Sequence, residues 1–139
     1  MKTALLALSF ALGVAVVPHH AFAQATVVKQ RLVIQMSDAE PGKWKLALSN
    51  AKNVQQDLGK QNVDIVAYGP GIAMLKLESE AGNGVSEAMR DGVKVIACEN
   101  TMRNQKLKHE DMQSGISYVD AGVVEIMQKQ QQGWAYIRP

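Results

Sequence analysis

The sequence predicts a three-layer α/β fold, in which a mainly parallel sheet is covered by helices on both faces. Short runs rich in β-branched residues alternate with stretches of helical periodicity, and each connection is long enough for a crossover between parallel strands. The run at residues 93–98 is apolar on both faces, which is typical of a strand in the middle of a sheet that helices cover on each side.

The first half of the chain contains two predicted strands with one long helix between them. The strands are residues 27–36 and 63–68, both of which end at turn-forming residues. The helix tolerates Pro41 in its first turn, can be capped by Asp38 and ends at Gly59. Its apolar face is predicted to consist of Trp44, Leu48, Ala51, Val54 and Leu58.

The middle of the chain continues the alternation. Residues 72–77 fit either a third strand or a short helix, of which the helix is favoured. Residues 81–91 have helical spacing and end at Gly92, as a helix followed by glycine should. After the strand at 93–98, residues 99–106 are predicted to be a helix, because its acidic side chains come early and its basic ones late.

The last part of the chain predicts two more strands around a helix. The strands are residues 116–119 and 134–137. Asp120 is expected to cap the helix and Gly133 to end it. The predicted buried face of this helix is Val123, Ile126, Met127 and Gln130.

The start of the chain has the features of a secretory signal peptide. After a basic start, residues 4–17 are mostly apolar, and the small residues Ala21 and Ala23 precede a cleavage site. A membrane helix is disfavoured, because this apolar stretch is shorter than the roughly 20 residues that cross a bilayer. We predict that cleavage after Ala23 separates a signal at 1–23 from one domain at 24–139, which is periplasmic or secreted and free of the membrane.

Composition narrows the function classes. A formal net charge of +2 gives no electrostatic reason to propose nucleic acid or an anionic membrane as a partner. The chain has a single cysteine, Cys98, which cannot form an intrachain disulfide even in an oxidising compartment. Any covalent chemistry at Cys98 must therefore finish on another molecule.

The site is expected at the carboxyl ends of the strands, where open parallel sheets bind their ligands. The residues that follow predicted strands are Ser37, Asp38, Tyr68, Gly69, Gly71, Cys98, Glu99, Asn100, Thr101, Val119 and Asp120. Cys98 is the strong nucleophile among them. Because a helix begins just after it, the backbone N–H groups of Asn100 and Thr101 face its sulfur and favour the thiolate.

The residues leave alternatives open at three of these positions. Free cysteine is among the most buried residue types, so Cys98 can instead be a small apolar side chain that ends a core strand. Asp38 is either a helix cap or an acid of the site. Arg103, about a turn and a half beyond the cysteine, either binds an anionic group or is a solvated arginine.

No metal and no cofactor is predicted. Residues 109–111, His-Glu-Asp, lack the ligand spacing of a zinc or EF-hand site. The Gly-Pro-Gly turn at 69–71 matches no phosphate-binding pattern. Because His19 and His20 lie in the predicted signal, only His109 would remain, and no Ser-His-Asp set can be assembled.

Three segments carry a family resemblance. They are Tyr68-Gly69-x-Gly71, then Gly92-Val93 leading into Ala97-Cys98-x-Asn100-Thr101-x-Arg103, and the closing Gly133-Trp134-Ala135-Tyr136-Ile137-Arg138-Pro139. Over residues 29–139 the chain resembles the DsrE/DsrF-like family of small sulfur-relay domains, in its branch of short single-domain members. The resemblance implies five strands, a helix at 72–77, assembly into trimers or hexamers, and a cysteine, here Cys98, that carries sulfane sulfur as a persulfide.

Two classes of function follow. In the first, a sulfurtransferase or sulfur carrier, the Cys98 thiolate takes a sulfur atom from a thiol-bearing donor or a polysulfide and passes it to an acceptor thiol. The residues expected to bind the substrate are Asn100, Thr101, Arg103, Asp38, Tyr68, Gly69 and Gly71. In the second, the chain is a non-enzymatic binding or assembly module with a structural Cys98. A thiol peroxidase is disfavoured by the missing second thiol, and a dithiol oxidoreductase by the absence of Cys-x-x-Cys.

Overall fold

A parallel sheet forms the middle layer of the fold, as the computed structural model of residues 30–59 and 63–139 describes it. The strands are β1 (Leu32–Met36), β2 (Val63–Ala67), β3 (Lys94–Cys98), β4 (Ser117–Val119) and β5 (Ala135–Ile137). The α-helices are α1 (Pro41–Leu58), α2 (Gly82–Arg90), α3 (Glu99–Asn104) and α4 (Gly122–Gln131), and the 3-10 helices are η1 (Gly69–Leu75) and η2 (His109–Asp111).

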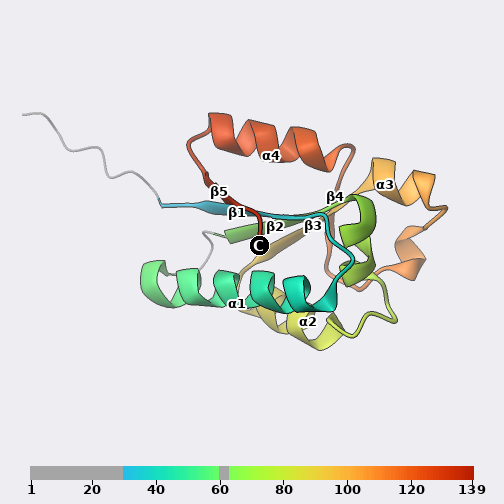
Figure 1. The fold of residues 1–139 in the computed structure, drawn as a ribbon, viewed down its shortest axis with the longest axis horizontal. Helices are drawn as coiled ribbons and strands as arrows, with labels where there is room; N and C mark the ends of the chain where they lie inside the picture. Colours follow the sequence, from blue (N-terminus) through green and yellow to red (C-terminus); the bar gives the residue numbers. More distant parts are fainter. Residues whose placement is uncertain (1–29, 60–62) are drawn as a thin grey trace, which may run out of the picture.

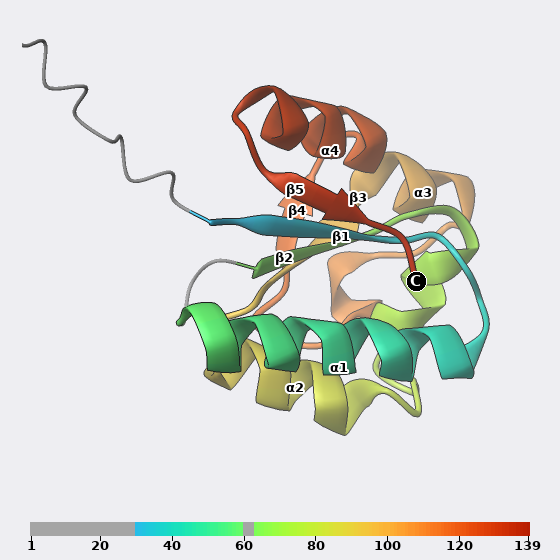
Figure 2. The same ribbon diagram turned by 60° about the vertical axis from the view of Figure 1, so that its left-hand side comes forward.

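The five strands lie in the order β4-β3-β2-β1-β5, and every neighbouring pair is parallel. Helices α1 and α2 pack beneath the sheet and α4 packs above it, while α3 lies beyond one end of the strands (Figure 1). Turning the view brings α1 and α2 side by side under the sheet (Figure 2). The three-layer α/β fold with five parallel strands is therefore confirmed. The run at 93–98 is an interior strand, although β2 and not β3 is the central one.

The larger core lies between the sheet and α1 with α2. On α1 Trp44 and Ala51 are buried as predicted, and so is Ala47, which the predicted face did not include. Leu48 and Val54 of the predicted face are partly buried against the same core. The indole N–H of Trp44 donates to the carbonyl of Asp38 at 2.8 Å, which fixes the chain entering the helix. Leu58 is 45% exposed, so the predicted apolar face leaves the core at the last turn.

The smaller core lies under α4, where the predicted helix face is right at Ile126 and wrong at Val123, Met127 and Gln130. Val123 and Met127 are 60% and 50% exposed, whereas Ile126 is buried and the helix also turns Gly122 and Lys129 toward the sheet. Ile126 packs in a cluster with three buried strand residues, Val33, Val66 and Ile96.

A lysine is buried on this face because two carboxylates compensate its charge. The Nζ of Lys129 lies 2.6 Å from Asp64 of β2 and 3.1 Å from Glu125, and 4.2 Å from the centroid of the Trp134 ring. Burial alone lowers the pKa of Lys129, but the hydrogen bonds and charges of Asp64 and Glu125 outweigh it, so that the pKa is raised. The ammonium is thus part of the core packing.

Two predicted helix caps are also wrong. Glu40 and Ala121 stand at the N-cap positions of α1 and α4, and neither makes a side-chain cap hydrogen bond. Asp38 and Asp120 lie one or two residues further out, and Asp38 pairs instead with Arg138. The helix ends are as expected: the chain leaves α4 through Gly133, which has a φ of 82° that favours glycine.

The ambiguous segment at 72–77 is helical in most of its length, as favoured, but it is the end of the 3-10 helix η1. The predicted signal at 1–23 lies outside the described residues, so its cleavage stays a prediction. Among the residues that the structure describes, we find no helix with the length and apolar character needed to cross a bilayer.

Candidate functional site

Cys98 lies at the carboxyl edge of the sheet, as predicted. It is the last residue of β3 and the N-cap of α3, with extended dihedral angles (φ −85°, ψ 114°) that let the helix begin at the next residue. Its side chain faces α4: a Cβ added to Gly122 would lie 3.3 Å from the Cβ of Cys98 and 3.2 Å from that of Tyr68. The first turn of α4, Tyr68 and the cysteine thus converge, and Cys98 is only 5% exposed.

Polar groups surround the sulfur. Burial alone raises the pKa of the Cys98 thiol, but hydrogen bonds from the backbone N–H of Gly122, the hydroxyl of Thr101 and the backbone N–H groups of Thr101 and Asn100 outweigh it. The pKa is lowered from its ordinary value of 9.0. The thiol itself donates to the carbonyl of Asp120 at 3.8 Å, a contact that favours the protonated form, and this carbonyl also accepts the backbone N–H of Asn100 at 3.0 Å. On balance the donors around the sulfur outweigh this contact and favour the thiolate, the reactive form of cysteine.

Thr101 has the most specific role among these donors. Its buried hydroxyl accepts a hydrogen bond from the backbone N–H of Gly69 at 2.9 Å. Since a hydroxyl has one proton to donate, this acceptance leaves the proton of Thr101 for the sulfur. The side-chain amide of Gln105 donates to the carbonyl of Gly69 at 3.2 Å, which holds the loop in place.

The two glycines after β2 form the loop beside Cys98. The backbone N–H groups of both donate hydrogen bonds within the chain. The N–H of Gly69 donates to Thr101, and that of Gly71 donates to the carbonyl of Tyr68 at 3.1 Å. Gly69 has a φ of 54°, and a Cβ on Gly71 would lie 2.3 Å from the carbonyl oxygen of Met36. Both are predicted to bind substrate, and in this structure their N–H groups hold the loop.

Tyr68 connects the cysteine with the C-terminal end of the chain. Burial is the main cause that raises the pKa of Tyr68; the phenol of Tyr136 and the thiolate of Cys98 raise it further, while the cation of Arg138 lowers it. Its phenol therefore stays protonated and can donate a hydrogen bond. It stands in the electrostatic reach of both Cys98 and Arg138.

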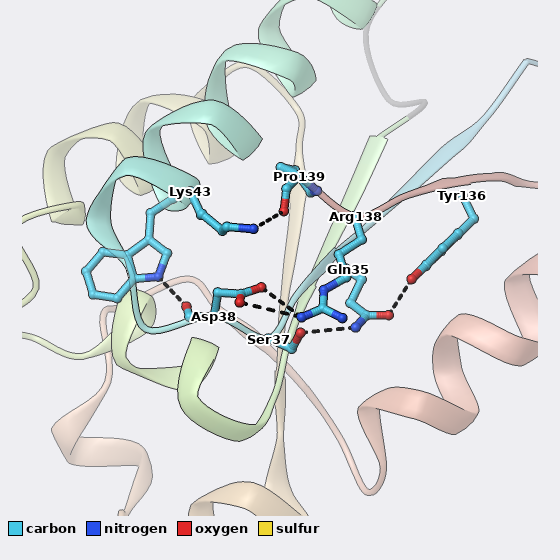
Figure 3. Close-up of polar contacts among 8 residues, drawn as sticks. Gln35, Ser37, Asp38, Lys43, Tyr136, Arg138 and Pro139 are labelled. Atoms are coloured by element: carbon cyan, nitrogen blue, oxygen red, sulfur yellow. Dashed lines mark hydrogen bonds and ion pairs between the residues drawn. The ribbon is translucent and has the colours of Figure 1, made fainter.

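The residues after β5 are fastened to the end of β1 (Figure 3). The Nη2 of Arg138 lies 3.2 Å and 3.5 Å from the two carboxylate oxygens of Asp38. The ammonium of Lys43 donates to the carbonyl of Pro139 at 3.2 Å. Asp38, predicted as a cap or a site acid, thus holds a cation at the carboxyl edge of the sheet.

A second chain of hydrogen bonds supports this attachment. The phenol of Tyr136 donates to Oε1 of Gln35 at 2.6 Å, and the amide nitrogen of Gln35 donates to the hydroxyl of Ser37 at 3.1 Å (Figure 3). β5 and β1 are neighbours although they are about a hundred residues apart in the sequence, so these contacts depend on the complete sheet.

Arg103, expected to bind an anionic group, is held by its own helix. Its guanidinium donates to the side-chain oxygen of Asn100 and lies 3.6 Å from the carboxylate of Glu99. Glu99 also contacts His109 at 3.0 Å, and the His109 ring stacks on Tyr118 with 3.8 Å between centroids. Of the two arginines at this end of the sheet, Arg138 is the one beside Tyr68.

Sequence reasoning missed Arg138 and Gly122 as residues of the site. Arg138 follows β5 directly, so the rule about carboxyl ends, applied to the last strand as well, would have found it. Gly122 had no such signal, since its N–H reaches Cys98 only through the packing of α4. Within residues 30–59 and 63–139, no group of three or more His, Cys, Asp or Glu side chains is placed to hold a metal ion.

The comparisons with known proteins agree with this geometry. A model of the DsrE/DsrF-like family matches residues 30–139. The solved structure of MTH1491, a protein of unknown function from Methanobacterium thermoautotrophicum, is similar with a TM-score of 0.76 and 35% identity, over 79% of this chain and 99% of that one. No curated protein matches the sequence.

Two more distant structures share the fold. BT1422 of Bacteroides thetaiotaomicron has a TM-score of 0.67 at 13% identity, over 79% of this chain and 95% of that chain. The ychN protein of E. coli has a TM-score of 0.62 at 14% identity, over 78% of this chain and 99% of that chain. With the family match over nearly all described residues and the 35% identity of MTH1491, the chain belongs to the DsrE/DsrF-like family.

Proposed function

We propose that the protein is a sulfur carrier that holds sulfane sulfur as a persulfide on Cys98 and passes it to a partner thiol. The family suggests a domain of the sulfur-relay type. The observation that carries the proposal is the set of hydrogen bonds that lower the pKa of Cys98 despite its burial.

The chemistry needs one cysteine. The Cys98 thiolate attacks the terminal sulfur of a persulfide or polysulfide, the S–S bond of the donor breaks, and the donor thiolate leaves with the electron pair. The new persulfide is stabilised by the same donors, Gly122, Thr101 and Asn100, that stabilise the thiolate. An acceptor thiolate then attacks the outer sulfur and releases Cys98, with no oxidant consumed and no second cysteine required.

Loading with polysulfide tests the proposal. The protein is incubated with polysulfide, separated from it and measured by intact mass spectrometry. The proposal predicts that the wild type gains the mass of one sulfur atom, and that an acceptor thiol removes it. Cys98→Ser is the matched control and should gain nothing, because the oxygen cannot replace the sulfur. A wild type that gains no mass at any pH at which it is folded contradicts the proposal.

The compartment belongs to the proposal as well. If the signal at 1–23 is cleaved, the carrier works in the periplasm or outside the cell, where its donor and acceptor must also be found. Mass spectrometry of the N-terminus of the exported protein tests this: a chain that begins at Gln24 supports export, and an intact Met1 in a cytoplasmic fraction contradicts it.

Assembly is the second candidate function, and two observations favour it. Cys98 is 5% exposed, and the outer face of α4 presents Val123, Val124 and Met127 to solvent. We propose that these side chains contribute to a homo-oligomer, a trimer or hexamer as the family resemblance implies. Light scattering of Met127→Glu, compared with the wild type, should show dissociation. A monomeric wild type contradicts the assembly proposal and leaves the carrier proposal intact.

A further inference from the structure

We propose that Arg138 and Tyr68 form an oxyanion subsite beside Cys98, which selects sulfur donors that carry a carboxylate or sulfonate group. This inference rests on the proposed sulfur-carrier function and names the class of donor. Its basis is the position of the Arg138 guanidinium, the hydrogen-bond donors that remain on it, and the protonated phenol between it and the thiolate.

Part of the Arg138 guanidinium is not occupied by Asp38. Only Nη2 contacts Asp38, at 3.2 Å and 3.5 Å from its two oxygens. Within the described part of the chain, Nη1 and Nε of Arg138 have no hydrogen-bond partner, and half of the side chain is exposed. A guanidinium binds carboxylates and sulfonates through two parallel N–H groups, so it can hold Asp38 on one side and a ligand on another.

The backbone around Arg138 is fixed before any ligand arrives. Tyr136, two residues before the arginine, is bound to Gln35, and Pro139, directly after it, is bound to Lys43, so that the chain on both sides of the arginine is tied to β1 and α1 (Figure 3). A solvated arginine that only improves solubility needs no such attachment. Because the flanking residues are held, less conformational entropy is lost when the guanidinium binds a ligand.

The spacing of the strand ends near the two groups fits a small donor. Asp38 holds the guanidinium near the end of β1, and Cys98 ends β3, with β2 between them. Neighbouring strands lie about 4.8 Å apart, so the two strand ends are about 10 Å apart. Tyr68, which directly follows β2, lies between the two strand ends, and its phenol interacts electrostatically with both Arg138 and Cys98. A donor with its oxyanion a few bonds from the sulfane sulfur spans it.

The reaction balances for both sources of the oxyanion. With cysteine persulfide, the thiolate attacks the outer sulfur, the S–S bond breaks, and cysteine thiolate leaves while Arg138 holds its carboxylate. With thiosulfate, the bond between the sulfane and the sulfonate sulfur breaks, and sulfite leaves with the electron pair. In each case Cys98 gains one sulfur atom, and no oxidant or reductant is needed.

The test compares donors that differ in the oxyanion. The rates at which Cys98 gains a sulfur atom are measured by quenched intact mass spectrometry with cysteine persulfide, with cysteamine persulfide, which lacks the carboxylate, and with thiosulfate. Arg138→Gln should slow loading from cysteine persulfide or thiosulfate by about tenfold or more, as expected for the loss of charge-assisted hydrogen bonds, and should not slow loading from cysteamine persulfide. Dependence with only one of the two oxyanion donors identifies which group is bound.

Control variants separate this selectivity from damage to the fold. Asp38→Asn removes the carboxylate that competes for the guanidinium, so it should keep or increase the preference for the oxyanion donors. Arg138→Lys keeps the positive charge but lacks the two parallel N–H groups of the guanidinium, so it should lose part of the preference for the oxyanion donors. Equal slowing of all three donors in Arg138→Gln, or no slowing, overturns the subsite while the carrier function stands. No loading of the wild type by any donor overturns both.

Discussion

Replacing Thr101 by valine removes one hydroxyl from the thiolate and leaves the shape of the side chain almost unchanged. In the structure this hydroxyl accepts from Gly69 at 2.9 Å and donates to the sulfur of Cys98. A hydrogen bond to a charged group contributes about 1.5–3 kcal/mol, and one pKa unit corresponds to about 1.4 kcal/mol. Thr101→Val should therefore raise the pKa of Cys98 by about 1–2 units.

The assay is the pH profile of alkylation of Cys98 by iodoacetamide. The thiolate fraction falls about tenfold per unit of raised pKa, but the intrinsic nucleophilicity of the remaining thiolate rises about threefold, so the rate at low pH should drop by only about 3- to 11-fold. The midpoint of the profile is thus the sharper readout. Thr101→Ser, which keeps the hydroxyl, is the matched control.

One side effect has to be separated from this result. Valine leaves the N–H of Gly69 without its acceptor, which costs about 1–3 kcal/mol of stability, so folding is checked by circular dichroism at each pH. A midpoint for Thr101→Val that coincides with those of the wild type and Thr101→Ser would refute the role assigned to the hydroxyl.

Three further predictions concern stability. The folded pKa of Cys98 lies below its ordinary value of 9.0, so the unfolded chain binds more protons between the two values. The free energy of unfolding of the wild type, relative to that of Cys98→Ser, should therefore rise with pH up to about 9 and be lost as the pH drops through the folded pKa. Chemical denaturation at several pH values measures this difference, and a difference that does not change with pH contradicts the prediction. Lys129→Met should lower the free energy of unfolding in urea by about 3–5 kcal/mol, because it leaves buried carboxylates without their cation. Adding Asp64→Asn should recover part of the loss, and additive losses would contradict the pairing. Gly71→Ala should destabilise strongly, since its Cβ would lie 2.3 Å from a backbone oxygen, whereas Gly42→Ala, with open space around it in α1, should be neutral or stabilise by up to about 1 kcal/mol; equal effects in thermal unfolding would argue against the packing described for Gly71.

The sequence contained enough information for the strands and for the position of Cys98. β-Branched runs between helical stretches predict where β2 and β3 lie, and the rule about strand ends places the cysteine at the edge of the sheet. Both depend on local pattern, which a single sequence expresses well. The donors from Asn100 and Thr101 were predicted for the same reason, because they follow the cysteine directly in the chain.

The buried face of α4 could not be predicted in this way. Periodicity favours apolar side chains, so the predicted face included Val123 and Met127 and did not include Lys129. In the structure Val123 and Met127 are exposed and Lys129 is buried. The lysine can be buried because Asp64, far away in the sequence, provides the opposite charge. Such a pairing has no local signature.

The same limit applies to the C-terminal side of the site. Asp38 looks like a helix cap when only its neighbours in the chain are considered, and Arg138 looks like a solvated residue just after a strand. Their contact exists because β5 pairs with β1, which joins residues a hundred positions apart. Long-range pairing of this kind decides which charged groups of the site are free and which are already bound.

Hydrogen bonds lower the pKa of the Cys98 thiol although the sulfur is buried, and the sulfur-carrier proposal depends on this. The direct measurement is a pH titration of thiolate absorbance in the wild type, with the titration of Cys98→Ser subtracted to remove the tyrosines. The hydrogen bonds from Gly122, Thr101 and Asn100 predict a midpoint below 9.0. A midpoint at or above 9.0 in the folded protein would contradict the account, because burial would then outweigh the donors.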